Sequence, residues 1–173
     1  MALEIERKWL IDPAALPLSL ERFECHRIEQ SYLSFSPQIR LRAIDDTRFV
    51  LTVKGKASGQ KSPLVRDEHE HELTEEAYAK LRGKTEGKTL LKKRYVIPEE
   101  AVSDALPASA TSAARSGRFF EIDVYEGEFS GLAVAEMEFA SLEEAEAYPT
   151  PTWAKADVSA DSRYRNVVMA QGD

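Results

Sequence analysis

The residues best suited to chemistry are acidic and basic side chains that recur at every second position of short segments. Near the start of the chain Glu4 and Glu6 are followed by Lys8, and later Arg40 and Arg42 have the same spacing. Carboxylate oxygens are the ligands that divalent cations such as Mg²⁺ prefer, whereas Arg and Lys donate hydrogen bonds to anionic oxygens. Both types of group in one chain indicate a site that binds a metal ion together with an anion.

A period of two places these side chains on β-strands, because successive side chains of a strand point to opposite faces. The alternation predicts strands over residues 3–11, 24–35, 38–45, 47–55, 64–73, 89–97, 118–126 and 132–139. Asp45 and Asp46 have the composition of a tight hairpin turn between two of these strands.

Few helices are expected. Thr74 can cap a helix over 75–82, and Ser141 can cap one over 142–148 that stops at a proline. A last helix is predicted over about 160–171. The Ala- and Ser-rich stretch 99–117 fits neither period and is interpreted as a surface loop or a weak helix.

The length of 173 residues predicts a single domain over 1–173 with an adequate core. Many short strands with little helix place it in the α+β class, mainly β, as an antiparallel barrel or sandwich.

Ionisable side chains occupy one face of most of these strands almost alone. The basic members are Lys8, Arg40, Arg42, Lys54, Arg66, Lys92 and Arg94. The acidic members are Glu4, Glu6, Glu68, Glu70, Glu72, Glu121, Asp123, Glu136 and Glu138. For any single strand, the simplest interpretation is a sheet whose charged face lies in water. Solvated faces normally mix Ser, Thr, Asn and Gln with charges, so the set as a whole favours a shared interior.

The two signs are also segregated. Strands 38–45, 47–55 and 89–97 are basic on this face, whereas 118–126 and 132–139 are acidic. Closing the sheet would set a basic wall opposite an acidic one. Carboxylates that face one another repel unless a cation joins them, and clustered Arg and Lys need an anion. A polyphosphate with a divalent metal satisfies both walls.

A family resemblance rests on motifs in order along the chain. Glu4-Ile5-Glu6-Arg7-Lys8 matches an E-x-E-x-K signature. It is followed by Arg40-Leu41-Arg42, Thr52-Val53-Lys54-Gly55, Arg66 with Glu68 and Glu70, Lys92-Lys93-Arg94-Tyr95, Phe120-Glu121-Ile122-Asp123-Val124, Glu136-Met137-Glu138-Phe139 and Asp161-Ser162-Arg163-Tyr164-Arg165-Asn166. With these motifs the chain resembles the CYTH superfamily, also called the triphosphate tunnel metalloenzymes, in the manner of its bacterial inorganic triphosphatases.

The resemblance implies an eight-stranded antiparallel closed β-barrel, the triphosphate tunnel, with helices packed outside. It implies that Lys8, Arg40, Arg42, Lys54, Lys92 and Arg94 bind the triphosphate, and Arg66 shares their face. Glu4, Glu6, Glu136 and Glu138 would hold one or two Mg²⁺ or Mn²⁺ ions, with Glu68, Glu70 and Asp123 as further ligands or water-orienting groups. Arg163 and Arg165 resemble the C-terminal segment that plugs one mouth of the tunnel.

The expected reaction is hydrolysis of a linear triphosphate by water, with inorganic tripolyphosphate as the leading substrate. Glu136 and Glu138 would bind the metal, and a free carboxylate such as Glu138 would orient and deprotonate the attacking water. Lys8 would bridge the metal site and the phosphate. An adenylate cyclase or a thiamine triphosphatase of the same superfamily is an alternative. A non-catalytic module that binds polyphosphate or nucleotide is an alternative of another class.

Other partners are excluded or left open by composition. The formal net charge of −7 argues against broad binding to nucleic acid or to an anionic membrane. Cys25 is the only cysteine, so neither an intrachain disulfide nor a cysteine metal site is expected. The first residues lack a long apolar run, and a cytoplasmic enzyme is expected. A homodimer built on the apolar outer sheet is a further expectation.

Overall fold

The structure is a computed structural model that describes residues 2–56, 65–105 and 117–172, with the side chains at 2–4, 55, 56, 65–67 and 103–105 left out. Its strands are β1 (Ala2–Ile11), β2 (Glu24–Phe35), β3 (Gln38–Ile44), β4 (Arg48–Lys56), β5 (Val65–Leu73), β6 (Glu86–Pro98), β7 (Phe119–Glu126), β8 (Ala133–Glu138) and β9 (Ala154–Asp157). The α-helices are α1 (Glu75–Arg82), α3 (Leu142–Ala147) and α4 (Asn166–Gln171). Short 3₁₀ turns lie at Pro13–Ala15, Leu20–Arg22, Glu99–Ala105, Gly127–Phe129 and Ser162–Tyr164.

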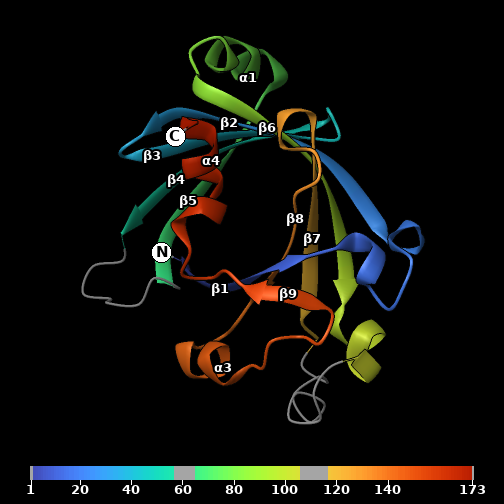
Figure 1. Cartoon of the computed structure of the whole chain (residues 1–173). Helices are drawn as coiled ribbons and strands as arrows, with labels where there is room; N and C mark the ends of the chain where they lie inside the picture. The colour runs from blue at the N-terminus through green and yellow to red at the C-terminus, as the bar shows by residue number, and fades with distance from the viewer. Residues whose placement is uncertain (1, 57–64, 106–116, 173) are drawn as a thin grey trace.

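All strands belong to one antiparallel sheet in the order β5-β4-β3-β2-β6-β7-β8-β1-β9. β5 also pairs with β1, with Ala2 opposite Glu68 and Ile5 opposite Val65. The sheet curls so that its strands surround a common centre (Figure 1). A mainly antiparallel β protein with few helices was expected from the sequence, and the predicted strands are confirmed to within a few residues.

Two sequence predictions need correction. Residues 160–171 do not form one helix, because Arg165 has extended backbone between the turn Ser162–Tyr164 and α4. The short strand β9 was not predicted at all, and it pairs with the edge of β1 opposite β8, beyond the point where β5 ends, with Trp9 opposite Asp157. Within 99–117 the described part begins as a 3₁₀ turn, and residues 106–116 lie outside the described residues.

Local chemistry explains the turns and helix starts. Asp45 and Asp46 both have positive φ angles, 53° and 54°, as the two central residues of a type I′ turn do, and the Thr47 amide donates to the Ile44 carbonyl oxygen at 3.1 Å. The Thr74 hydroxyl accepts a hydrogen bond from the Ala77 amide at the start of α1, and the Ser141 hydroxyl does the same for the Glu144 amide at the start of α3.

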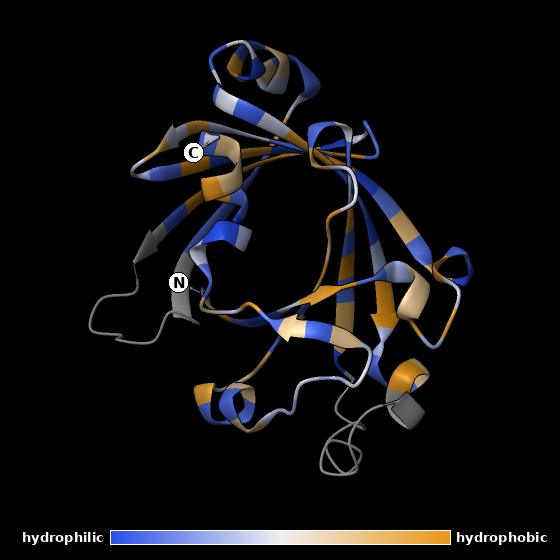
Figure 2. Ribbon diagram, in the orientation of Figure 1, coloured by the Kyte–Doolittle hydropathy of each residue, from blue (hydrophilic) through white to orange (hydrophobic). Residues whose placement is uncertain are grey.

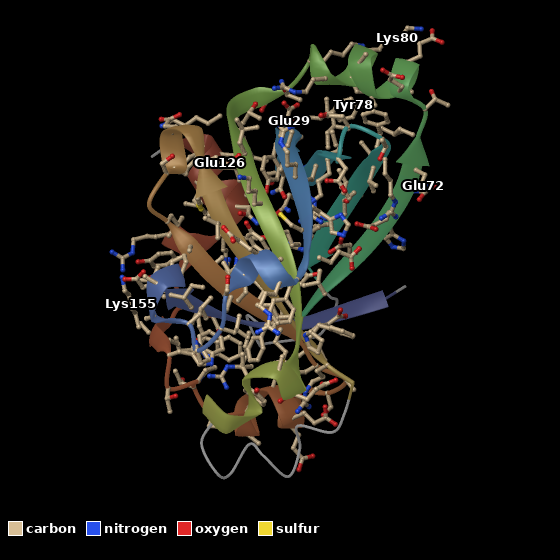
Figure 3. All side chains as sticks on the ribbon, turned by 90° about the vertical axis from the view of Figure 1, so that its right-hand side faces the viewer. Glu29, Glu72, Tyr78, Lys80, Glu126 and Lys155 are labelled. Carbon is tan, nitrogen blue, oxygen red and sulfur yellow. The ribbon has the colours of Figure 1, made fainter. Side chains whose placement is uncertain are left out.

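The hydrophobic core lies mostly on the outer face of the sheet. Hydrophilic and hydrophobic residues alternate along the strands (Figure 2). Trp9, Phe120 and Ile122 are buried on the outer face together with Tyr148, which follows α3. A second outer cluster lies under α1, where Tyr78 packs on Leu41 and Ala43. The Tyr78 hydroxyl donates to Glu29 of β2 at 2.9 Å (Figure 3).

Apolar residues also close one end of the inner face. Leu90, Tyr125 and Val134 belong to the same strand rows as the inner charges, and Met169 of α4 packs on them. Gly87 of β6 permits this, since a Cβ there would lie 2.3 Å from the Ala170 carbonyl oxygen. No helix in the described part of the chain is long and apolar enough to cross a membrane.

Candidate active site

The inner rows of the strands meet in a narrow polar cavity of about 70 Å³. Its lining includes the predicted residues Glu6, Lys8, Arg40, Arg42, Lys54, Arg94, Glu136 and Arg165. Most of the ionisable face on β1, β3, β4, β6 and β8 therefore points inward, and seven predicted residues from these strands reach one cavity together with Arg165 of the C-terminal segment.

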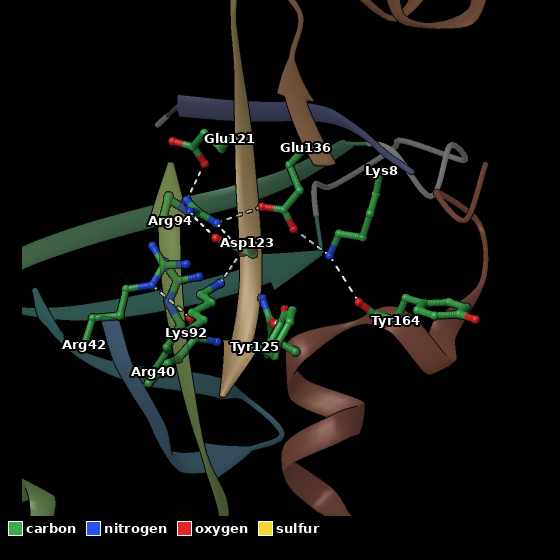
Figure 4. Close-up of polar contacts among 12 residues, drawn as sticks. Lys8, Arg40, Arg42, Lys92, Arg94, Glu121, Asp123, Tyr125, Glu136 and Tyr164 are labelled. Carbon is green, nitrogen blue, oxygen red and sulfur yellow. Dashed lines mark hydrogen bonds and ion pairs between the residues drawn. The ribbon is translucent and has the colours of Figure 1, made fainter. Parts of the chain in front are cut away.

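An ion-pair network crosses the inner face from β1 to β6 (Figure 4). The Lys8 Nζ lies 2.7 Å from Glu136 Oε1, and Arg94 Nη2 lies 2.9 Å from Glu136 Oε2. Arg94 also holds Asp123 through Nε at 2.7 Å and Nη2 at 2.8 Å, and Lys92 Nζ contacts the same carboxylate at 2.5 Å. We call these five residues the inner network.

Mutual attraction keeps the inner network charged in spite of burial. Burial opposes ionisation of Glu136, but Lys8 and Arg94 hold the pKa of this carboxyl well below its usual value. Burial lowers the pKa of Lys8, but the carboxylates of Glu136, Glu6 and Asp123 together outweigh burial, so the pKa is raised. Lys92 differs: burial lowers its pKa to about 8, and Asp123 offsets that effect only in part.

A second basic group lies on β3 and β4. Arg40 Nη2 lies 3.0 Å from Glu68 Oε1, and Lys54 Nζ lies 2.6 Å from Glu68 Oε2. Arg40 also donates to the Thr52 hydroxyl at 3.1 Å. Glu68, which was predicted as a metal ligand or water-orienting group, is therefore bound by two cations of the chain itself, as Asp123 is.

Arg42 differs from Lys8, Arg40, Lys54, Lys92 and Arg94, each of which contacts a carboxylate. Its Nε donates to the Gln30 side-chain oxygen at 2.9 Å, and no ion pair joins it to a carboxylate of the described part. Burial and the nearby charges of Arg40 and Arg94 lower the pKa of Arg42 to about 10. A half-buried guanidinium without a carboxylate partner keeps its charge uncompensated, so this position is suited to an anionic ligand.

Carboxylates gather at the end of the inner face away from α4. Glu6 lies directly opposite Glu138 in the β1–β8 pair, and both line a cavity of about 450 Å³ with Glu121 and Glu136. Burial and the charges of Glu121 and Glu6 raise the pKa of Glu138. Like charges opposite one another are unfavourable unless a cation joins them.

This carboxylate group fits a divalent metal by the chemistry of its donors, since hard cations prefer several carboxylate oxygens. The described side chains contain no preformed set of three His, Cys, Asp or Glu that could hold a metal. Glu4 lies outside the described side chains, and its backbone pairs with that of Arg66, whose side chain is likewise outside them.

Three other residues of the predicted charged set do not line the 70 Å³ cavity. Glu70 has a side chain 45% exposed and lies 3.5 Å from Arg40. Glu72 is exposed and pairs with Arg48. Arg163 was expected beside Arg165, but its side chain is 80% exposed and binds Asp161, so the structure does not bring it into the cavity.

Several lining residues were missed from sequence. Tyr32, Gln38 and Asn166 line the cavity, and Gln30 is buried beside Arg42. Extending the alternation to β2 would have found Gln30 and Tyr32, which continue one row of that strand. Glu121 was on the charged face but was not given a role, and it pairs with Arg94 at the carboxylate end.

Comparison with known proteins gives two curated relatives of matching length. An inorganic triphosphatase of Nitrosomonas europaea is 33% identical over 96% of both chains. An inorganic triphosphatase of Acetivibrio thermocellus is 30% identical over 96% of this chain and 92% of its own. No protein-family model matches the chain.

Solved structures agree with this fold. A crystal structure of an inorganic triphosphatase is 28% identical, with a TM-score of 0.63, and the match covers 100% of this chain and 97% of that one. A putative adenylyl cyclase from Hippeastrum with a dominant triphosphatase activity has a TM-score of 0.56 at 18% identity, over 84% of this chain and 83% of that one. At that identity the likeness concerns the fold.

Proposed function

This chain belongs to the inorganic triphosphatases of the CYTH superfamily, and we propose from this that it hydrolyses inorganic tripolyphosphate to pyrophosphate and phosphate. The observation that carries the proposal is the position of Arg42. This half-buried guanidinium has no carboxylate partner among the described residues, and it lies in a cavity with Arg40, Lys54 and Arg94. An anion with several oxygens, such as triphosphate, completes this arrangement.

The sheet is proposed to work as a closed tunnel that holds the linear substrate. The pairing of β5 with β1 supports closure, because it joins strands at the two sides of the curled sheet. α4 covers one end through Met169, so substrate would enter from the carboxylate end near Glu6 and Glu138.

A divalent metal, Mg²⁺ or Mn²⁺ as one or two ions, is proposed at the carboxylate end. Glu6, Glu136 and Glu138 are the residues that would hold it, with Glu4 from the same strand as Glu6. When bound, the metal supplies charge neutralisation to the phosphate chain and lowers the pKa of a coordinated water. Asp123 and Glu68 are bound by Lys92, Arg94, Arg40 and Lys54, so either would have to leave these partners to serve a metal.

The chain's own side chains have separate tasks in this reaction. Arg42, Arg40 and Lys54 bind the phosphate oxygens and fix the direction of the substrate. Lys8 and Arg94 lie next to Glu136, where they stabilise negative charge on the oxygens as the anhydride bond breaks. Glu138 lies at the carboxylate end, where it is placed to accept the proton of the attacking water.

The function is tested by supplying the purified protein and Mg²⁺ with tripolyphosphate, ATP or thiamine triphosphate in turn. One phosphate and one pyrophosphate released per tripolyphosphate are expected, and EDTA should stop the release. Pyrophosphate with cyclic AMP from ATP would indicate a cyclase instead. Tight binding of tripolyphosphate without products would indicate a binding module.

The metal site has its own test. Glu6→Gln removes one carboxylate charge, and we expect weaker Mn²⁺ binding by calorimetry together with loss of turnover, while the circular dichroism spectrum stays unchanged. Unaltered Mn²⁺ binding and near-normal turnover in this variant would remove Glu6 from the site.

A further inference from the structure

Gln30 is a neutral polar side chain buried among the inner charges. It is fully buried, with 0% of its surface exposed, and it lies on β2 directly opposite Arg42 of β3. Burying an amide costs free energy unless its hydrogen bonds are made, so its partners are informative.

The partners fix the orientation of the amide. Arg42 Nε can only donate, so the Gln30 oxygen must face it, and the two atoms lie 2.9 Å apart. The Gln30 nitrogen then faces the Tyr32 hydroxyl oxygen at 2.7 Å and donates to it. Tyr32 thus accepts from Gln30 and keeps its own proton for another partner in the cavity.

A neutral partner distinguishes Arg42 from Arg40 and Arg94. Arg40 is held by Glu68, and Arg94 is held by Asp123 and Glu136. A carboxylate holds a guanidinium and also cancels its charge, whereas an amide oxygen holds it and leaves the charge available. The hydrogen bond at Nε also occupies one edge of the group and leaves the Nη atoms for a ligand.

We propose that Gln30 is a positioning residue, whose side-chain amide holds the Arg42 guanidinium in place for the anion without neutralising it. This inference rests on the proposed function, since it gives Arg42 the role of a contact to triphosphate. It predicts that Gln30 acts through Arg42, and that only an uncharged acceptor serves at this position.

A double-mutant cycle tests the proposal on the intact protein. Gln30→Met keeps the length of the side chain and removes its hydrogen bonds to Arg42. For hydrolysis of tripolyphosphate with Mg²⁺ we expect the KM to rise about tenfold, the size of one hydrogen bond to a charged group, with kcat changed less than about twofold. In an Arg42→Ala background the same substitution should change the KM less than about twofold.

Two further variants separate positioning from a general effect on folding. Gln30→Glu still accepts from Arg42 but cancels its charge, so the KM should rise here too, although the fold is kept. Ser31→Ala alters the next residue of β2, buried on the opposite face, and should leave both constants unchanged. Should Gln30→Met fail to fold, Gln30→Asn, whose amide is one methylene shorter, replaces it in the cycle.

The outcomes distinguish this proposal from the function on which it rests. Wild-type protein that neither binds nor hydrolyses tripolyphosphate would refute the function itself. Wild-type activity with fully additive losses in the double variant would refute only the role of Gln30. A near wild-type KM in Gln30→Glu would also count against it, because charge at this position would then be unimportant.

Discussion

Arg7 and Lys8 are neighbours in β1 and both are buried, yet they serve the two sides of the sheet differently. Arg7 faces outward, where it donates to the carbonyl oxygens of Ala145, at 2.9 Å, and Tyr148 and pairs with Asp157. Its guanidinium lies 5.1 Å from the centre of the Trp9 ring. Lys8 faces inward and joins the inner network through Glu136.

The outer face repeats this pattern around Glu99. This carboxylate is fully buried and accepts from Arg118 at 3.1 and 3.3 Å and from the Tyr148 hydroxyl at 2.8 Å. The Arg118 guanidinium is stacked against Phe139 and Tyr148. Outer charges are thus held by backbone carbonyls, aromatic rings and fixed partners, which suits a permanent structural role.

The inner charges instead border a cavity. Most of their partners are other ionisable side chains, which can be exchanged for phosphate oxygens or a metal. The comparison therefore teaches that burial and pairing alone do not mark a functional charge. What separates the two sides is whether the partners can be replaced by a ligand.

The strongest test exchanges Lys8 for a neutral side chain of similar length. Lys8→Met removes a phosphate contact and a partner of Glu136, and Glu136 keeps its hydrogen bond to Arg94. We expect kcat for tripolyphosphate to fall about a thousandfold, because charge stabilisation in the transition state is lost, while the melting temperature changes little. Full activity would place Lys8 among the structural charges.

The matched change on the outer side should reverse this result. Arg7→Met removes the donor to two buried carbonyl oxygens and to the part-buried Asp157 carboxylate, and buried acceptors left without a donor cost about 2 kcal/mol of folding free energy. Urea unfolding should show the loss, whereas kcat of the folded protein should stay within about twofold of wild type. Lost activity without lost stability would contradict the distinction between the two faces.

Proton uptake provides a smaller effect that belongs to the inner side only. Lys92 has a pKa of about 8, so it is only partly protonated at pH 8.5, and a bound anion favours the protonated form. Binding at pH 8.5 should take up about 0.7 of a proton, and affinity should weaken as pH rises above 8. Calorimetry in two buffers of different ionisation enthalpy measures the uptake, and Lys92→Met should abolish it.

The smallest effect on stability is expected for the exposed pair of His26 and Asp45, which belongs to neither the inner nor the outer charges. The hydrogen bond that His26 Nδ1 donates to the Asp45 carboxylate outweighs burial and raises the pKa of His26, so its protonated form is stabilised on folding. This stabilisation is complete below pH 6.5, the unfolded pKa, and is lost as pH rises through the raised folded pKa. His26→Gln should cost about 0.5 kcal/mol at pH 5.5 and less at pH 9 by urea unfolding, because the pair is exposed.

The inner rows could be predicted from sequence because alternation along a strand is a local property. Lys8, Arg40 and Arg94 follow it, and once their strands are identified their shared face follows as well. The turn at Asp45 and Asp46 and the caps of α1 and α3 were equally local.

Features set by tertiary contacts escaped prediction. The Tyr164 carbonyl accepts from Lys8 Nζ at 3.1 Å, an oxygen that a continuous C-terminal helix would have used for its own hydrogen bond. Gln30 gave no signal as a partner of Arg42 until the register of β2 and β3 was known. β9 is too short to show a period.

The pairing of β1 has a consequence for how the chain folds. Its Glu4, Lys8 and Trp9 pair with Arg66, Glu136 and Asp157, so every neighbour of this strand is distant in sequence. Hairpins such as β2–β3 close over a few residues, whereas β1 must wait until remote segments have collapsed, and such long-range closure is slow. We expect docking of β1 to be a late event on the folding pathway, so that the charges it carries come together only when the rest of the molecule is in place.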